Sequence, residues 1–227
     1  MTHSRPIRSF VRREGRLTPG QQRAIERLWP RYGIDNDQSL LDLDKLFGRT
    51  AERAAEIGFG NGEALAELAR RHPDTDFLGF EVHRPGIGRL LLAIEEHGLE
   101  NIRIVDHDAA EVLESRLGDR SLDRAMIWFP DPWPKKRHHK RRLIQPPFLT
   151  LLARRLRAGG TLHLATDWAH YAEQMNEMLR ASPYFELVND AGEWARPQTK
   201  FERRGLKLGH DVSEFVARRN DQSINDA

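Results

Sequence analysis

Short apolar segments alternate with amphipathic segments along the chain from Ala51 onward. The apolar segments predict strands at residues 53–57, 76–80, 101–105, 123–129 and, after a turn at "RAGG", 161–166. The segments between them repeat apolar residues at helical spacing and predict helices at residues 61–71, 84–97 and 168–181. This alternation is typical of a mostly parallel sheet with helices on both faces.

The two ends of the chain depart from this pattern. The segment up to about Arg16 is polar and rich in arginine, which predicts a flexible arm. Thr18 and Pro19 have the residue types of a helix N-cap and a first helical position, so a short helix is expected through "GQQRAIERLW". The alternating segments "YFELVND" and "DVSEFVARR" suit an antiparallel C-terminal edge, giving an expected sheet of seven strands. We expect an arm and short helix over residues 1–48, one α/β domain over residues 49–219 and a flexible tail over residues 220–227.

The composition limits what this domain can be. A chain of 227 residues that is 39% hydrophobic can bury one full α/β core. With 36 Lys and Arg against 34 Asp and Glu, the net charge of +2 is small, so a nucleic-acid partner has to be inferred from local clusters. The absence of cysteine excludes disulfides, thiolate metal sites and a cysteine nucleophile. With no apolar export signal and no apolar run of membrane-spanning length, we expect a soluble, cytoplasmic protein.

A glycine-rich turn follows the first predicted strand, in "EIGFGNG". Gly58, Gly60 and Gly62 would let the backbone approach a ligand closely and direct helix N-terminal amides toward it. A dinucleotide-binding turn needs its third glycine one place later, where this chain has Glu63, so NAD is disfavoured. Such turns also occur as plain connections between a strand and a helix.

Three carboxylates surround this turn in the predicted topology. Glu81 ends the second strand about twenty residues further on, where an acidic side chain can accept both ribose hydroxyls of an adenosine. Asp108 could meet the amino group of the adenine, although an N-cap of the following helix is an equally good interpretation. Glu56 is either an ordinary loop charge or the partner of an ammonium group. Together these residues fit the S-adenosylmethionine pocket of a class I methyltransferase better than a phosphate-rich cofactor.

A rigid carboxylate ends the fourth predicted strand in "FPDPW". Pro130 and Pro132 restrict the backbone on both sides of Asp131, which is held stiffly as a result. Asp167 ends the fifth strand in "LATDW", and ligands of open α/β sheets bind at these carboxyl ends, so we expect both carboxylates to converge beside the cofactor. Asp131 could instead be a polar turn residue and Asp167 a helix N-cap. Trp133 could cover the edge of the core or stack on a base.

A run of basic residues, "KKRHHKRR", occupies positions 135–142. Such a run is usually a solvated helix face. Like charges packed this tightly repel one another, and a phosphate backbone would relieve that repulsion. The run therefore predicts contact of Lys135 and Lys136 with a nucleotide at the site, and contact of the later residues with phosphates further away.

Five motifs occur in the order "EIGFGNG", "FLGFEVH", "FPDPWPKKRHHKRR", "LATDW" and "TKFERRGLKLGH". With these motifs and the N-terminal "RSFVRREGRLTPGQQRA", nearly the whole chain resembles the bacterial tRNA (guanine-N7-)-methyltransferase family. The resemblance implies a Rossmann-like class I methyltransferase fold with its catalytic domain over residues 49–219. It also implies transfer of a methyl group from S-adenosyl-L-methionine to N7 of the guanosine at position 46 in the variable loop of tRNA.

The resemblance also assigns roles to individual residues. Asp131 is then the catalytic residue, and the cofactor-binding region comprises Glu56, Gly58, Gly60, Gly62, Glu81, Asp108 and Asp131. The residues implied to contact substrate are Lys135, Asp167, Thr199, Lys200, Phe201 and Glu202. Guanine N7 carries no proton, so we expect Asp131 to orient the base and stabilise the cationic product, with Asp167 or Glu202 assisting. The expected partner is tRNA, and the protein is expected to be a monomer or a homodimer.

Two alternatives remain open at this stage. Class I methyltransferases that act on an exocyclic adenine amine also carry Asp or Asn and prolines after the fourth strand. A non-catalytic RNA-binding module could retain the same fold, although the intact glycine turn and Glu81 argue against that. A metal site is not expected, because His138 and His139 lie in a basic run that repels cations and there are no thiolates.

Overall fold

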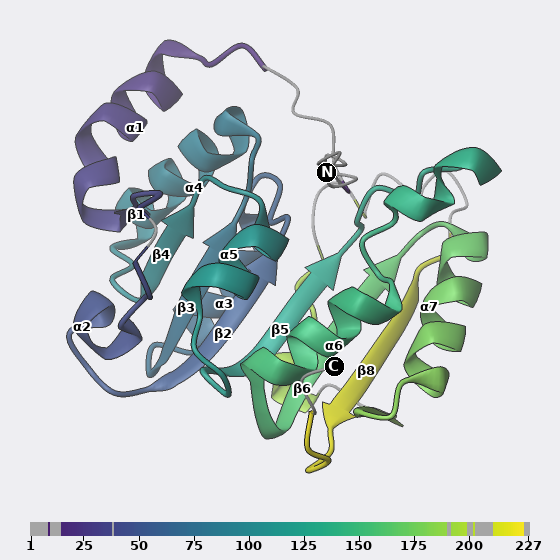
Figure 1. Ribbon diagram of the computed structural model, residues 1–227. Helices are drawn as coiled ribbons and strands as arrows, with labels where there is room; N and C mark the ends of the chain where they lie inside the picture. The colour runs from purple at the N-terminus through teal and green to yellow at the C-terminus, as the bar shows by residue number, and fades with distance from the viewer. Residues whose placement is uncertain are drawn as a thin grey trace, which may run out of the picture.

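An eight-stranded sheet forms the centre of the protein, with strand order β1-β4-β3-β2-β5-β6-β8-β7 (Figure 1). The computed structural model describes residues 9, 15–37, 39–189, 192–198, 202 and 211–224. The strands are β1 (Gly33–Ile34), β2 (Glu52–Ile57), β3 (Thr75–Phe80), β4 (Ile102–Val105), β5 (Leu122–Trp128), β6 (Leu156–Thr166), β7 (Phe185–Val188) and β8 (Ser213–Arg219). Neighbours from β1 to β6 are parallel, and β8 is antiparallel to both β6 and β7. The expected antiparallel pairing at the C-terminal edge of the sheet is therefore confirmed.

The sheet has one strand more than the seven expected from the sequence. The additional strand is β1, which pairs Gly33 with Ile104 and Ile34 with Val105. Two residues are too few to show a period-two pattern, so this strand arises from the packing of the preceding helix and leaves no signal in the sequence. The last strand along the chain, β8, lies between β6 and β7, so it is not the outermost strand.

Helices cover both faces of the sheet and enclose two apolar cores (Figure 1). The α-helices are α1 (Pro19–Tyr32), α2 (Leu43–Phe47), α3 (Glu63–Arg71), α4 (Arg84–His97), α5 (Ala109–Arg116), α6 (Pro146–Arg155) and α7 (Ala169–Ala181). One core joins α1, α3 and α4 to the sheet through side chains such as Leu65 and Leu90. The other joins α5, α6 and α7 to the opposite face through side chains such as Leu113, Leu152 and Met175.

Local sequence accounts for the start of α1 and the side chains of β3. The Thr18 side chain accepts a hydrogen bond from Gln21 N, and Gln21 Oε1 accepts one from Thr18 N, which together form a capping box. In β3, Phe77 and Leu78 are both fully buried, but they belong to the two different cores. A strand covered on both faces in this way appears in sequence as a continuous apolar run.

The predicted elements recur with boundary shifts of at most two residues, except at α1, which ends at Tyr32 and not at Trp29, and at β6. This strand begins at Leu156, so the expected turn at "RAGG" is wrong. Leu156 pairs with Leu122, and the register shifts before Arg124 pairs with Thr161. Gly159 takes the left-handed conformation there, with φ at 78°, so the glycines accommodate an irregularity within the strand.

Gly86 in α4 lies against the glycine turn, and replacing it should destabilise the protein. A Cβ atom on Gly86 would lie 2.1 Å from the carbonyl oxygen of Gly60, so one backbone segment would have to move. We expect Gly86→Ala to lower stability by about 1–3 kcal/mol, seen as a lower Tm. Gly20→Ala is the matched control, because its Cβ has no heavy atom closer than 4.0 Å. Equal Tm values for the two variants would contradict this close approach.

Candidate active site

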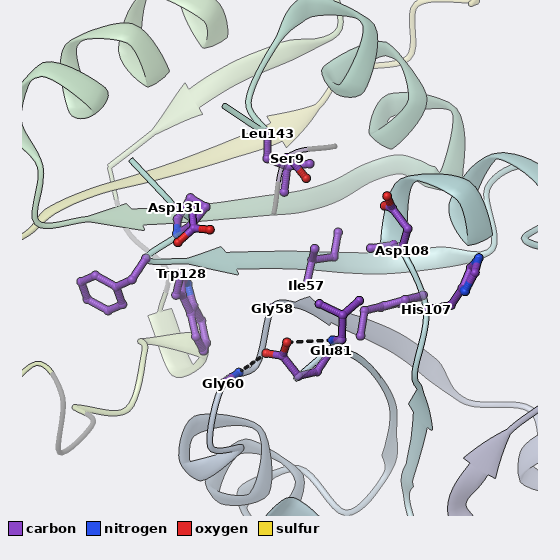
Figure 2. A pocket seen from close by; sticks show the side chains of 15 residues that line it. Ser9, Ile57, Gly58, Gly60, Glu81, His107, Asp108, Trp128, Asp131 and Leu143 are labelled. Carbon is purple, nitrogen blue, oxygen red and sulfur yellow. Dashed lines mark hydrogen bonds between the residues drawn. The ribbon is translucent and has the colours of Figure 1, made fainter. Parts of the chain in front are cut away.

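A cavity of about 300 Å³ opens at the carboxyl ends of the parallel strands (Figure 2). Its lining includes Gly58 and Gly60 after β2, Glu81 after β3, and Asp131 after β5. The strand order reverses between β2 and β5, and the crevice at such a reversal is where open α/β sheets bind their ligands. Gly58, Gly60, Glu81, Asp108 and Asp131, which the sequence analysis singled out, line this cavity.

The glycine turn needs its glycines for conformation. Gly58 and Gly60 have φ values of 77° and 56°, in the left-handed region that other residues rarely adopt. A Cβ atom at either position would have no heavy atom within 4 Å, so backbone conformation, and not lack of space, selects glycine. Gly60 N donates to Glu81 Oε2 at 2.8 Å, which ties the turn to the end of β3.

Glu81 and Asp108 are both fixed by backbone amides and both line the cavity. Glu81 Oε1 accepts hydrogen bonds from Val82 N at 2.8 Å and His83 N at 3.0 Å. Asp108 is the N-cap of α5, and its Oδ1 accepts from Ala110 N at 3.0 Å, so the capping interpretation of this residue is confirmed. Figure 2 shows Asp108 on one side of the cavity, Asp131 on the other side, and Glu81 at the glycine turn. Capping and ligand contact are compatible at Asp108, because a carboxylate has two oxygens.

A second cavity, of about 240 Å³, adjoins the first along the glycine turn. The residues that line both cavities are Gly58, Gly60, Trp128 and Phe129. Glu56 and Arg196 line the second cavity.

Glu56 is buried, and its Oε2 has no hydrogen-bond partner among the residues that the structure describes. Burial raises the pKa of Glu56 to about 8; the Glu81 charge adds to this effect and Arg196 opposes it. A buried carboxylate with an unused oxygen beside a cavity suits a cationic ligand group.

Asp131 and Asp167 follow neighbouring parallel strands. Ala165 of β6 pairs with Trp128 of β5, and Phe129 N continues the ladder by donating to the Ala165 carbonyl at 2.8 Å. Asp131 comes three residues after Trp128 and Asp167 two residues after Ala165, so both carboxylates follow this pair at the same edge of the sheet, as the sequence predicted. Asp131 is exposed. Asp167 does not have the predicted capping position, because the N-cap of α7 is Trp168.

Glu202 is buried and paired. Its two carboxylate oxygens accept from the two terminal nitrogens of Arg196, at 2.5 and 2.6 Å. Arg196 also donates to Glu214 on β8 at 2.7 Å, and its guanidinium lies 5.0 Å from the centre of the Phe129 ring. Substrate contact by Glu202 would thus use lone pairs that Arg196 leaves over. Thr199, Lys200 and Phe201, the predicted substrate contacts that directly precede Glu202, lie outside the described residues.

Arg196 could not be singled out from the sequence, because a single arginine in "EWARP" belongs to no recognisable pattern. A chain of polar contacts links it to the sheet, since His163 Nε2 lies 2.9 Å from the second oxygen of Glu214. These contacts join Glu202, the strands β6 and β8, and the end of β5.

Comparison with known proteins identifies the chain's relatives. A family model described as "Putative methyltransferase" matches residues 50–215. A tRNA (guanine-N(7)-)-methyltransferase of Alkalilimnicola ehrlichii is 55% identical over 97% of this chain and 95% of its own length. One of Halorhodospira halophila is 56% identical over 96% of this chain and 97% of its own length. The chain belongs to the tRNA (guanine-N(7)-)-methyltransferase family.

Solved structures share the fold of this tRNA (guanine-N(7)-)-methyltransferase family member at low sequence identity. The 16S rRNA methyltransferase KamB has a TM-score of 0.57 at 13% identity, covering 80% of this chain and 94% of its own. The antibiotic-resistance methyltransferase Kmr has a TM-score of 0.55 at 18% identity, covering 84% of this chain and 96% of its own. The Rossmann-like class I methyltransferase fold is therefore confirmed.

The basic run of this family member forms a short 3₁₀ helix, η1 (Lys136–Arg141). The exposed cations of this region are Lys135, Lys136, Arg137 and Lys140. Arg142 differs from them, because only 2% of its surface is accessible. The expectation that the whole run meets phosphates is thus wrong at Arg142, whose guanidinium is enclosed by protein. Trp168, next to Asp167, is 41% exposed and presents an aromatic surface at the same edge of the sheet.

Neither a membrane-spanning helix nor a metal-binding cluster is observed within the described part of this family member. Its helices there include none with the length and apolar composition that crossing a membrane requires. The described side chains also contain no group of three His, Cys, Asp or Glu residues that could hold a metal ion.

The raised pKa of Glu56 predicts a pH-dependent stability. A carboxyl with an ordinary pKa of 4.5 and a folded-state pKa of about 8 makes the folded protein bind a proton that the unfolded chain has lost. Stability without cofactor should therefore fall as pH rises from about 5 to about 8. Glu56→Gln should remove this loss and stabilise the protein by about 4 kcal/mol at the upper end of that range.

The free energy of unfolding of wild type and variant is measured by urea denaturation across this pH range without cofactor. The effect is the difference between the two values at each pH. Glu96→Gln, at an exposed position of α4, is the control and should leave the profile unchanged. A wild-type profile that runs parallel to that of Glu56→Gln would show that the Glu56 carboxyl does not titrate in this window.

Proposed function

We propose that this protein transfers the methyl group of S-adenosyl-L-methionine to N7 of the guanosine at position 46 in the variable loop of tRNA. The observation that carries the proposal is the position of Asp131, which lines the cavity of about 300 Å³ and lies four residues before the exposed basic turn. The names of relatives that are 55% and 56% identical over nearly the whole chain support the same reaction.

The two adjoining cavities fit the two ends of the cofactor. Glu81 faces the first cavity with a carboxylate held by three backbone amides, which leaves about one lone-pair site, on Oε2, for a ribose hydroxyl. Asp108 lines the same cavity at the position proposed for the adenine amino group. Glu56 lines the second cavity, and its Oε2, which has no hydrogen-bond partner among the described residues, suits the ammonium of the methionine end. When bound, S-adenosylmethionine supplies an electrophilic methyl group on a sulfonium.

The methyl transfer requires the guanine base to be oriented and does not require a proton to be removed from N7. Guanine N7 has an in-plane lone pair and no proton, so the site needs no general base. Asp131 instead accepts the N1–H and N2–H of guanine as a pair of hydrogen bonds, a pattern that adenine does not offer. The same negative charge stabilises the cationic base that forms. Asp167, at the end of the adjacent strand, assists in this orientation, and Trp168 beside it offers a surface on which a base can stack.

The exposed basic turn binds the tRNA backbone. Lys135 lies four residues after Asp131, and it is followed by the exposed Lys136, Arg137 and Lys140 of η1. These cations contact phosphates and release counterions, so they position the tRNA while the carboxylates select the base. Thr199 and Lys200 are proposed to contact substrate on the strength of the family motif.

The reaction is tested by incubating the protein with methyl-labelled S-adenosylmethionine and unmodified tRNA, digesting the tRNA and identifying the labelled nucleoside. N7-methylguanosine is the expected product, and replacing the target guanosine should abolish labelling. Label in a methylated adenosine would overturn the assignment of the base, and tight cofactor binding without transfer would favour a non-catalytic RNA-binding protein.

Asp131→Ala should lower kcat at least about 10²-fold, because the base loses both its orientation and its electrostatic stabilisation. Cofactor affinity, measured by calorimetric titration, should change less than about threefold, a free-energy difference below ~0.7 kcal/mol. Asp74→Ala is the matched control, an exposed aspartate between α3 and β3 at the opposite end of the strands. An Asp131→Ala protein with the activity of Asp74→Ala would rule out this role.

A further inference from the structure

Arg142 ends the basic run but has a different environment from the rest of it. Only 2% of its surface is accessible, whereas Lys136, Arg137 and Lys140 are exposed. Burial removes this guanidinium from any phosphate that approaches the surface. An arginine is seldom buried fully unless its donors are used, so the contacts of this side chain are informative.

The guanidinium of Arg142 joins the loop of Asp131 to helix α7. Its Nε donates to the Pro132 carbonyl at 2.8 Å. Its Nη1 donates to Gln174 Oε1 at 2.7 Å and lies 3.0 Å from His170 Nδ1. The guanidinium also lies 4.7 Å from the centre of the Tyr171 ring. All of these partners are on α7 except Pro132, so Arg142 connects helix α7 to the residue after Asp131.

Arg142 has no acidic partner in the part of the chain that the structure describes. Its donors meet a carbonyl, an amide oxygen and a ring nitrogen, and the buried Nη2 makes no hydrogen bond with a described residue. Burial lowers the pKa of the Arg142 guanidinium, because the charge is removed from water and no carboxylate compensates it among the described residues. A buried cation of this kind costs free energy, so a stabilising ion pair does not explain it.

The loop that Arg142 holds has an uncommon backbone. Phe129 and Trp133 both have positive φ values, 54° and 44°, and they flank the segment of Pro130, Asp131 and Pro132. Such conformations cost roughly 1–3 kcal/mol each and persist only where the surrounding structure holds them. Phe129 N is held by the Ala165 carbonyl, and Trp133 Nε1 donates to the Ser9 carbonyl at 2.8 Å.

The carbonyl of Pro132 is the point at which Arg142 fixes the loop between these two anchors. Proline has no N–H, so neither Pro130 nor Pro132 can hold the loop by donating a backbone hydrogen bond. The Pro132 carbonyl can accept a hydrogen bond, and the bond from Arg142 fixes the backbone on the C-terminal side of Asp131.

We propose that Arg142 is a positioning residue of the methyl transfer: it fixes the backbone beside Asp131 and does not bind tRNA. The inference rests on the function proposed above. The basic run then has two roles. Its exposed cations bind the phosphates of the tRNA, and its last arginine orients the carboxylate that binds the target base. A displacement of Asp131 by about 1 Å is enough to cost on the order of 10²-fold in rate.

Steady-state kinetics with unmodified tRNA separates these roles. We expect Arg142→Met to lower kcat about 10²-fold while the KM for tRNA and its salt dependence stay at wild-type values. Arg142→Lys keeps the charge but lacks the forked donors, so its kcat should lie between those of Arg142→Met and the wild type. Arg137→Met is the contrasting variant from the same turn. It should raise the KM for tRNA and make the plot of log KM against log salt shallower by about 0.7–0.9.

Cofactor titration and thermal unfolding of Arg142→Met show whether the rest of the protein is intact, and both should remain close to wild type. If Arg142→Met does not fold, Gln174→Leu decides, because it removes the acceptor at 2.7 Å and keeps the guanidinium. A lower kcat at wild-type KM in that variant supports the assignment, and an unchanged kcat overturns it.

Two outcomes distinguish this inference from the function on which it rests. Wild-type protein that forms no N7-methylguanosine contradicts the proposed function, and the inference falls with it. Wild-type activity together with an undiminished kcat in Arg142→Met overturns the inference alone. A variant whose KM and salt dependence change as in Arg137→Met would likewise show that Arg142 binds phosphate.

Discussion

The parallel pairing of β2 with β3 on one side and with β5 on the other is the constraint on which the site depends. Parallel strands present their carboxyl ends at one edge, so residues that are far apart in the chain meet there. The glycine turn follows β2, Glu81 follows β3, Asp131 follows β5 and Asp167 follows β6. Helices on both faces supply the crossovers that parallel pairing requires, and their apolar faces bury the strands.

Three buried ionisable side chains lie at this edge of the sheet or beside a loop that forms it. Glu56, Arg142 and Arg196 all lie within protein, and each touches the site or a loop that forms it. Charges in such places cost stability, and proteins commonly retain them where they orient or bind. The three differ in how the cost is met. Arg196 has two carboxylate partners, Arg142 has neutral acceptors, and one oxygen of Glu56 has no hydrogen-bond partner among the described residues.

The loop from Phe129 to Trp133 combines rigidity from two sources. Prolines on both sides of Asp131 restrict the chain locally, and long-range contacts hold the two aromatic residues in the left-handed region. A carboxylate held in this way keeps its orientation before substrate arrives, so little reorganisation is left for the reaction itself. The same loop leads directly into the exposed cations of η1, so base recognition and backbone recognition lie on one continuous segment.

Local patterns in the sequence are enough to predict the succession of most strands and helices along the chain, the glycine turn and the carboxylates at the strand ends. These follow from periodicity, from the conformational freedom of glycine and from the rigidity of proline, all of which are local properties. The sequence did not determine β1, the irregular start of β6, the pairing of Glu202 with Arg196 or the burial of Arg142. In sequence Arg142 is one of eight basic residues in a row, and nothing local separates it from Arg141. The two arginines differ only in the folded protein, because burial depends on which surface of a distant helix, here α7, packs against the side chain.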